Sequence, residues 1–269
     1  MKKLTLLLPS LLIVYSLTVY ADCGTGEPKA PCPDSVAKTA GCYKVVKQYR
    51  LTQALHGVNG MLQLLQDSRV TQFPHNKQFG AAFALYQDDE LIRLFKNSPP
   101  LGAVLRILMY EGEIARVEES HTFDHAPVSW LEEVRLSGSG TPSYLATCDL
   151  STGIGAHSGT ETYFYEVIYG KLRPIEYVDS KTKEKGTIAL VRSLVTNWKL
   201  VKSKDGKSQD ILYAECEPDA SKDPVEFKVY YNRYHFNGKK WVRYQRVERG
   251  YWEVDTDELP PLSKFPAGP

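Results

Sequence analysis

The feature that most constrains the fold of this sequence is a change of period near residue 128. From Val128 onward, β-branched and aromatic residues alternate with polar ones in short runs, which is typical of strands with one buried face. Glycine-centred turns separate several of these runs, at Gly170-Lys171, Asp205-Gly206-Lys207 and Asn237-Gly238-Lys239. Asp-Gly and Asn-Gly pairs favour the positive φ angles of tight hairpins. Residues 127–258 are therefore predicted to form an antiparallel β-rich region: a meander, a sandwich or a partial barrel.

Residues 22–126 show a pattern that favours helices. Asp34 is a candidate N-cap, Met61–Leu65 is a short amphipathic stretch, and three aromatic residues recur at helical spacing. These aromatic residues are Phe79, Phe83 and Tyr86. Acidic residues at 88–90 precede the apolar run 91–95, as a helix dipole favours, and Pro99-Pro100 end it. We expect another helix over Leu101–Tyr110, although Gly112 and the alternation of residues 114–117 also fit a hairpin.

The predicted fold class is therefore α+β, with a mainly helical N-terminal part followed by a larger antiparallel β-rich part. A proline-rich tail with little regular structure covers residues 259–269. The composition contains enough apolar residues, 42% of the chain, to bury a core without crosslinks.

The first 21 residues are predicted to be a secretory signal peptide. Lys2 and Lys3 precede an apolar run that extends from Leu4 to Val19, and the small residue Ala21 ends the segment. An uncleaved anchor is disfavoured because polar residues and a proline interrupt the run. Lipid attachment at Cys23 is disfavoured because Asp22, and not a small residue, precedes it. We expect cleavage after Ala21, export to the periplasm or the extracellular medium, and no stable membrane span afterwards.

Export and charge together exclude several classes of function. The first 21 residues carry two lysines and no acids, so the remainder has 31 basic residues against 32 acidic ones. A chain this close to neutral has no global field that attracts polyanions, and we expect no nucleic-acid partner. An exported chain also lacks ready access to ATP or reduced nicotinamides, and we expect no cofactor. The style of the leader and the lack of Asn-x-Ser/Thr sites fit a bacterial protein.

The five cysteines should pair where geometry allows in an oxidising compartment, and the odd count leaves at least one out. We predict a Cys148–Cys216 disulfide, because both residues fall on strand-like segments of the same half. A Cys23–Cys32 disulfide across the glycine- and proline-rich loop would then leave Cys42 as a buried thiol.

Two polar segments are candidate sites. The glycine-rich run over residues 149–159 leads into a strand-like segment, whereas a dinucleotide loop must lead into a helix. We therefore interpret the run as a loop whose tip presents His157 and Ser158.

His121 and His125 have the spacing of a metal-binding pair on a helix, but no further ligands can be assigned. We therefore expect a polar connection there and predict no metal site.

Catalytic motifs are also weak. Ser139 lacks the upstream glycine of a nucleophile elbow. Acids for a glycosidase-type pair are available at Glu132, Glu133, Glu161 and Glu166, but such pairs meet only in space. We expect no catalytic residues, with a hydrolase of an envelope polymer that uses unassigned carboxylates as the alternative.

The strongest anomaly in composition is the hairpin over residues 226–253, which has nine aromatic residues among seven basic ones. A two-residue Asn237-Gly238 turn places Tyr234 opposite Trp241 and Tyr231 opposite Tyr244, on opposite faces. One face would be core, and the other would offer aromatic and arginine side chains to a partner. The predicted surface consists of Tyr231, Arg233, Tyr234, Trp241, Arg243 and Tyr244. The predicted function is a non-catalytic exported module that binds a protein partner or a cell-wall polymer.

Overall fold

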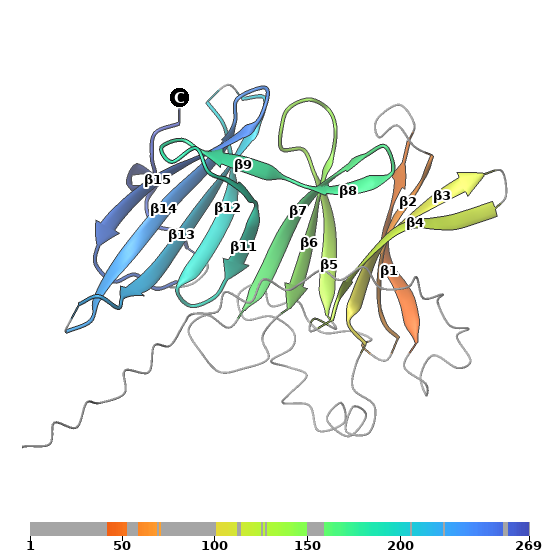
Figure 1. Ribbon diagram of the computed structural model, residues 1–269, viewed down its shortest axis with the longest axis horizontal. Helices are drawn as coiled ribbons and strands as arrows, with labels where there is room; N and C mark the ends of the chain where they lie inside the picture. The colour runs from red at the N-terminus through yellow and green to blue at the C-terminus, as the bar shows by residue number, and fades with distance from the viewer. Residues whose placement is uncertain are drawn as a thin grey trace, which may run out of the picture.

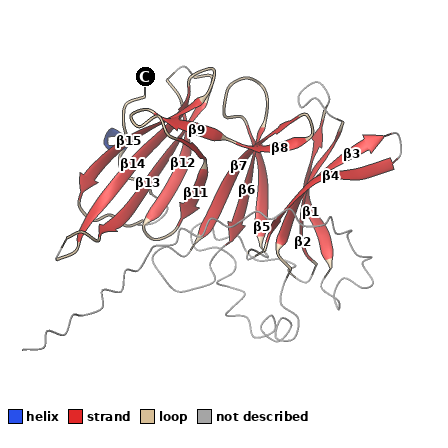
Figure 2. Cartoon of the chain, viewed as in Figure 1, coloured by secondary structure: helices blue, strands red, loops and turns tan. Residues whose placement is uncertain are grey.

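Strands make up nearly all of the regular structure in the part of the chain that the computed structural model describes (Figures 1 and 2). The described residues are 42–52, 59–68, 70, 101–111, 114–124, 126, 128–149, 159–204, 206–222, 224–254 and 258–268. Within these ranges the only helical element is one 3-10 turn, η1 (Leu262–Lys264).

The strands form three sheets. Sheet A is antiparallel in the order β1-β2-β3-β4 and contains β1 (Tyr43–Leu51), β2 (Gly60–Asp67), β3 (Ala103–Glu111) and β4 (Ile114–Phe123). Sheet B has the order β11-β7-β6-β5, with β8 also paired to β7, and contains β5 (Ser129–Val134), β6 (Ser143–Asp149), β7 (Thr160–Ile168), β8 (Lys171–Pro174) and β11 (Ala189–Arg192). Sheet C has the order β10-β9-β15-β14-β13-β12 and contains β9 (Glu176–Asp179), β10 (Lys185–Thr187), β12 (Thr196–Lys202), β13 (Gln209–Asp219), β14 (Glu226–Phe236) and β15 (Trp241–Arg249). Figure 1 shows sheet B between the other two.

Sheet B is a middle layer because successive side chains of its strands enter two different cores. Tyr144 and Ala146 of β6 join Leu62 and Leu105 of sheet A in one cluster, the A/B core. Leu145, between them in sequence, faces the other way and packs with sheet C in a second cluster, the B/C core. Side chains alternate in direction along a strand, so two-sided burial requires apolar residues at consecutive positions.

The outer face of sheet C is covered by the C-terminal segment. Phe265 is buried against Tyr231 of β14, with ring centroids 5.6 Å apart in an edge-to-face arrangement. Trp252 and Leu259 pack on the same cluster, which also contains Cys216 of β13. The backbone N–H of Trp252 donates to the Cys216 sulfur at 3.4 Å. The tail predicted from its prolines is therefore part of the structure, and its single regular element is η1.

The predicted helical N-terminal part is wrong for the residues that the structure describes. Met61–Leu65 lies in β2, where Leu62 and Leu64 enter the A/B core while Leu65 packs on the opposite face of sheet A. A strand buried on both faces is as continuously apolar as a buried helix, so periodicity cannot separate the two. Leu101–Tyr110 contains β3, which forms a hairpin with β4, and this confirms the alternative. The predicted N-cap Asp34 and the helices over residues 79–95 lie outside the described residues.

The three glycine-centred hairpins are confirmed. β7 pairs with β8, β12 with β13, and β14 with β15, each antiparallel across its predicted turn. In the first turn, Tyr169 and Gly170 have φ angles of 51° and 75°. Two successive positive φ angles are typical of the type I′ turn, whose twist matches that of the strands.

The register of the last hairpin differs from the prediction by two residues. Trp241 pairs with Phe236 and not with Tyr234, and Tyr244 pairs with Arg233 and not with Tyr231. Asn237 donates its N–H to the Lys240 carbonyl, which makes Gly238 and Lys239 the centre of the turn. A shift of two residues keeps every side chain on its predicted face, whereas a shift of one would exchange the faces.

Phe265→Ala should open the cover over the outer face of sheet C. Loss of the buried ring should cost about 3 kcal/mol of local stability, which corresponds to a rate of alkylation at the buried Cys216 thiol about 100-fold higher. The rate at Cys216 is measured by mass spectrometry of alkylated peptides, with Leu262→Ala, an exposed residue of the same segment, as the matched control. Equal rates in both variants would contradict a covering role for Phe265.

Candidate functional site

The structure buries most of the partner surface that the sequence predicts on the last hairpin. Tyr234 and Trp241 belong to the B/C core, and Tyr231 lies under Phe265 on the other face. Both faces are thus covered, because sheet B packs on one and the C-terminal segment on the other. Three of the four aromatic residues of the predicted surface, Tyr231, Tyr234 and Trp241, are therefore core residues.

The two arginines of that predicted surface form ion pairs. Arg243 Nε donates to Asp179 at 2.9 Å, and its guanidinium stacks on the Tyr177 ring at 4.9 Å. Burial raises the pKa of Asp179, but the backbone N–H groups of Thr182 and Lys181, followed by the Arg243 guanidinium, together hold this pKa below its usual range. Arg233 Nη1 donates to Asp210 at 3.0 Å. Tyr244 is half-buried.

The cysteine predictions need correction. Cys148 lies in the A/B core and Cys216 in the outer cluster of sheet C, and they are not joined in a disulfide. Cys148 faces sheet A, and Cys216 faces the C-terminal segment on the outer face of sheet C. The B/C core therefore lies between the two thiols. Cys42, which we expected as a thiol, is disulfide-bonded to a partner that lies outside the described residues. The predicted Cys23–Cys32 pair lies outside them too.

The other predicted polar sites are only partly described. His157 and Ser158, at the tip of the glycine-rich run, lie outside the described residues, as does His125. His121 lies on β4, so the expected polar connection is a strand, and its Nε2 pairs with Glu119 Oε1 at 3.4 Å. Within the described ranges, no group of three or more His, Cys, Asp or Glu side chains could hold a metal ion.

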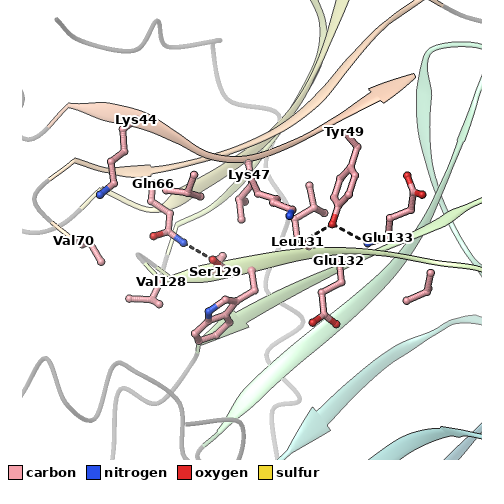
Figure 3. Close-up of a pocket in the computed structure, with 14 residues that line it drawn as sticks. Lys44, Lys47, Tyr49, Gln66, Val70, Val128, Ser129, Leu131, Glu132 and Glu133 are labelled. Carbon is pink, nitrogen blue, oxygen red and sulfur yellow. Dashed lines mark hydrogen bonds between the residues drawn. The ribbon is translucent and has the colours of Figure 1, made fainter. Parts of the chain in front are cut away.

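A large hollow in the described structure lies where the edge strands of two sheets face each other (Figure 3). β1 is an edge of sheet A and β5 is an edge of sheet B, and between them is a groove of about 760 Å³. Its apolar lining comes from both sheets: Val46, Leu64, Val70, Val128, Trp130, Leu131 and Val134. We call this hollow the β1/β5 groove.

Side chains from sheet A close the inner side of this groove. The Tyr49 hydroxyl donates to the Leu131 carbonyl at 3.2 Å and accepts from the Glu133 N–H at 3.1 Å. Gln66 Nε2 donates to the Ser129 carbonyl. These contacts satisfy edge groups of β5 that a further strand would otherwise bind, which blocks edge-to-edge pairing along β5.

Charges of opposite sign line the two sides of the groove. Lys44 and Lys47 project from β1, and Glu132 and Glu133 lie on β5 (Figure 3). Partial burial lowers the pKa of Lys44, although the charge of Asp67 opposes this shift. Lys47 Nζ lies 5.2 Å from the centre of the Tyr49 ring. The groove therefore has a basic side and an acidic side over an apolar floor.

A second, smaller hollow of about 180 Å³ adjoins the other side of β5. Trp130, Glu132 and Val134 line both hollows, because alternate side chains of β5 point away from sheet A. Arg192 also lines the second hollow, where its guanidinium lies 4.3 Å from the centre of the Trp198 ring and donates to the Trp198 carbonyl. An aromatic and charged surface thus continues around the β5 edge.

The carboxylates that could act as acids in a hydrolase are distributed over different parts of the fold. Glu132 and Glu133 are exposed at the groove. Burial raises the pKa of Glu161, although the Tyr163 hydroxyl, 2.7 Å away, partly offsets this shift. Burial also raises the pKa of Glu166. The hydrolase alternative stays a prediction.

Sequence reasoning missed one perturbed carboxyl group, on β13. Burial and the nearby charge of Glu217 raise the pKa of Glu215 to about 7, and a hydrogen bond from Tyr213 limits the shift. Glu215 and Glu217 share one face of the strand because they are two residues apart. Two acids two residues apart in a strand-like run could have indicated a raised pKa from the sequence. The burial of the Glu215 carboxyl, the larger cause, is visible only in the structure.

Comparisons with known proteins identify no relative. No protein-family model matches the chain, no curated protein is detectably similar in sequence, and no solved structure matches it. Among the described residues, no helix is long and apolar enough to cross a membrane.

Tyr49→Phe should weaken the closure of the β1/β5 groove. Loss of the hydroxyl leaves the Leu131 carbonyl and the Glu133 N–H without their bridge, which should cost about 1–2 kcal/mol. Hydrogen exchange at the Glu133 amide should accelerate about 10-fold, because 1.4 kcal/mol corresponds to a factor of ten. NMR measures the exchange rate of the Glu133 amide. An unchanged rate would show that the Tyr49 hydroxyl does not stabilise the edge of β5.

Glu215→Gln should change the pH dependence of stability. The pKa of Glu215 is raised on folding, so the contribution of its protonated carboxyl to stability is fully present at pH 4 and is lost as the pH rises through about 7. The variant should match the wild type at pH 4 and exceed it by about 3 kcal/mol at pH 8. Urea denaturation at both values measures the difference, with the more exposed Glu226→Gln as control. A Glu215→Gln difference that does not vary with pH would contradict the burial of this carboxyl.

Proposed function

We propose that this protein is a non-catalytic exported module that binds an extended segment of a protein partner in the β1/β5 groove. The carrying observation is the groove itself, with about 760 Å³ of space and side chains of both charges over an apolar floor. Ligand sites in proteins are concave, largely apolar and marked by a few placed polar groups.

The chemistry of the lining supports a polypeptide over a polymer of uniform charge. Lys44 and Lys47 favour acidic groups on one side, and Glu132 and Glu133 favour basic groups on the other. A polyanion would meet repulsion from the two glutamates. A peptide segment can present both charges and place apolar side chains between them.

Trp130 is the expected energetic centre of this surface. Its side chain is half-buried and lines the hollows on both sides of the β5 edge. Tryptophan, tyrosine and arginine dominate binding energy at protein interfaces, and Tyr49 and Arg192 flank it. Because the inner edge of β5 is already bonded by Tyr49, the partner segment would bind through side chains and not by adding a strand to β5.

Site-specific photocrosslinking tests this proposal. A photoreactive phenylalanine analogue replaces Trp130, or replaces Tyr169 as the control, since Tyr169 is 82% exposed on the distant β7–β8 turn. We expect a discrete protein adduct in the envelope fraction from position 130 and none from position 169. The adduct should diminish when Lys44→Glu and Lys47→Glu are added, because they remove the basic side.

Two outcomes would contradict the proposal. Adducts of equal yield at positions 130 and 169 would indicate non-specific capture. An adduct yield at position 130 that does not change on charge reversal would mean that the groove does not select its partner by charge. Circular dichroism must first show that the charge-reversed variant is folded.

A further inference from the structure

A separate hollow of about 460 Å³ lies at the turn end of the last hairpin, on the outer face of sheet C. Its lining includes the charged or titratable residues Lys204, Asp210, Arg233 and His235, together with Asn237 and Gly238 of the turn. Asp210 on β13 and the pair Arg233 and His235 on β14 lie on the face that also carries Leu212 and Tyr231. This hollow shares no lining residue with the β1/β5 groove.

Asp210 fixes two basic side chains at once. Its carboxylate is buried, with 2% of the side chain exposed, and each oxygen has its own donor. Arg233 Nη1 donates to Oδ2 at 3.0 Å, and His235 Nδ1 lies 2.8 Å from Oδ1. The guanidinium and the imidazole are therefore held in place before any ligand arrives, which lowers the ordering cost of binding.

The hollow has an excess of positive charge. Among the described residues of its lining, Asp210 is the only acid, whereas Lys204 and Arg233 are both cationic and His235 adds a third charge when protonated. Lys204 Nζ binds the Gly268 carbonyl at 3.1 Å, which does not neutralise it. One buried carboxylate thus faces at least two cations.

The Arg233 guanidinium is also incompletely satisfied. Its Nε is buried and has no hydrogen-bond partner among the described residues. An under-satisfied buried donor costs free energy, and an ordered water or an ion commonly satisfies such a group. Arginine and lysine are the side chains that proteins use to bind oxyanions.

We propose that this hollow is a binding site for a small molecule with an oxyanion group, a phosphoryl or a carboxylate. Arg233 and Lys204 hold the anion, and Asp210 acts as a positioning residue through Arg233 and His235. The volume exceeds that of an inorganic ion and suits a small organic anion. This site is independent of the proposed partner groove.

NMR titration of the isotope-labelled full chain tests the site. Inorganic phosphate and acetate are added in separate arms, each against sodium chloride at the same ionic strength. We expect a saturable shift of the Arg233 Nε–H and Gly238 amide resonances in at least one arm, and the arm that binds more tightly identifies the oxyanion. No saturable shift in either arm would overturn the proposal.

Variants separate binding from stability. Lys204→Met removes an exposed cation and should weaken binding about fivefold without unfolding the protein. The double variant Asp210→Asn/Arg233→Met removes both partners of the buried pair, so that no lone buried charge remains, and should abolish the shift. Arg249→Met, on the same hairpin with its side chain 77% exposed, should bind as the wild type does. Equally weakened oxyanion binding in Lys204→Met and Arg249→Met would show that binding depends only on net charge, and this would overturn the proposed site.

Discussion

The two-sided burial of sheet B determines the arrangement of the rest of the structure. Consecutive residues of β6 enter different cores, so neither face of this sheet can be left to solvent. Sheet A covers one face and sheet C the other. Sheet C then has an outer face of its own, and the segment around Phe265 covers that face.

The β1/β5 groove follows from this layering. Sheets A and B pack face to face, but their edge strands β1 and β5 do not pair with each other, and the seam between them stays open on one side. Side-chain amide and phenol groups substitute for a missing strand along β5. These side-chain hydrogen bonds protect the edge of β5 from association with another strand, and they leave a lined hollow for a ligand.

The local turn chemistry of this protein was predictable from its sequence, and the layer structure was not. The glycines of the Asn237-Gly238 and Asp205-Gly206 pairs identify hairpins, because Gly206 and Gly238 have the positive φ angles that other residues rarely adopt. The pattern of Met61–Leu65 predicts a helix, and this prediction is wrong because the two-sided burial of β2 removes the alternation that distinguishes a strand from a buried helix. The composition of the aromatic hairpin predicts a partner surface, because composition cannot show that sheet B and Phe265 cover its two faces. The β1/β5 groove depends on side chains from strands distant in sequence, such as Tyr49 and Glu133, which no local pattern connects.

The parallel pairing within sheet C affects how the chain can reach this fold. β9 binds β15 through pairs such as Tyr177 with Trp241, which are 64 residues apart, and within the described part of the chain β9 is the only strand that pairs with β10. In a chain that emerges from its N-terminus, β9 and β10 have no sheet to join until the last strand has been made. Contacts this distant in sequence slow folding and prolong the exposure of strand edges. During synthesis, the segment around Tyr177 is therefore the part of sheet C that would most benefit from a chaperone.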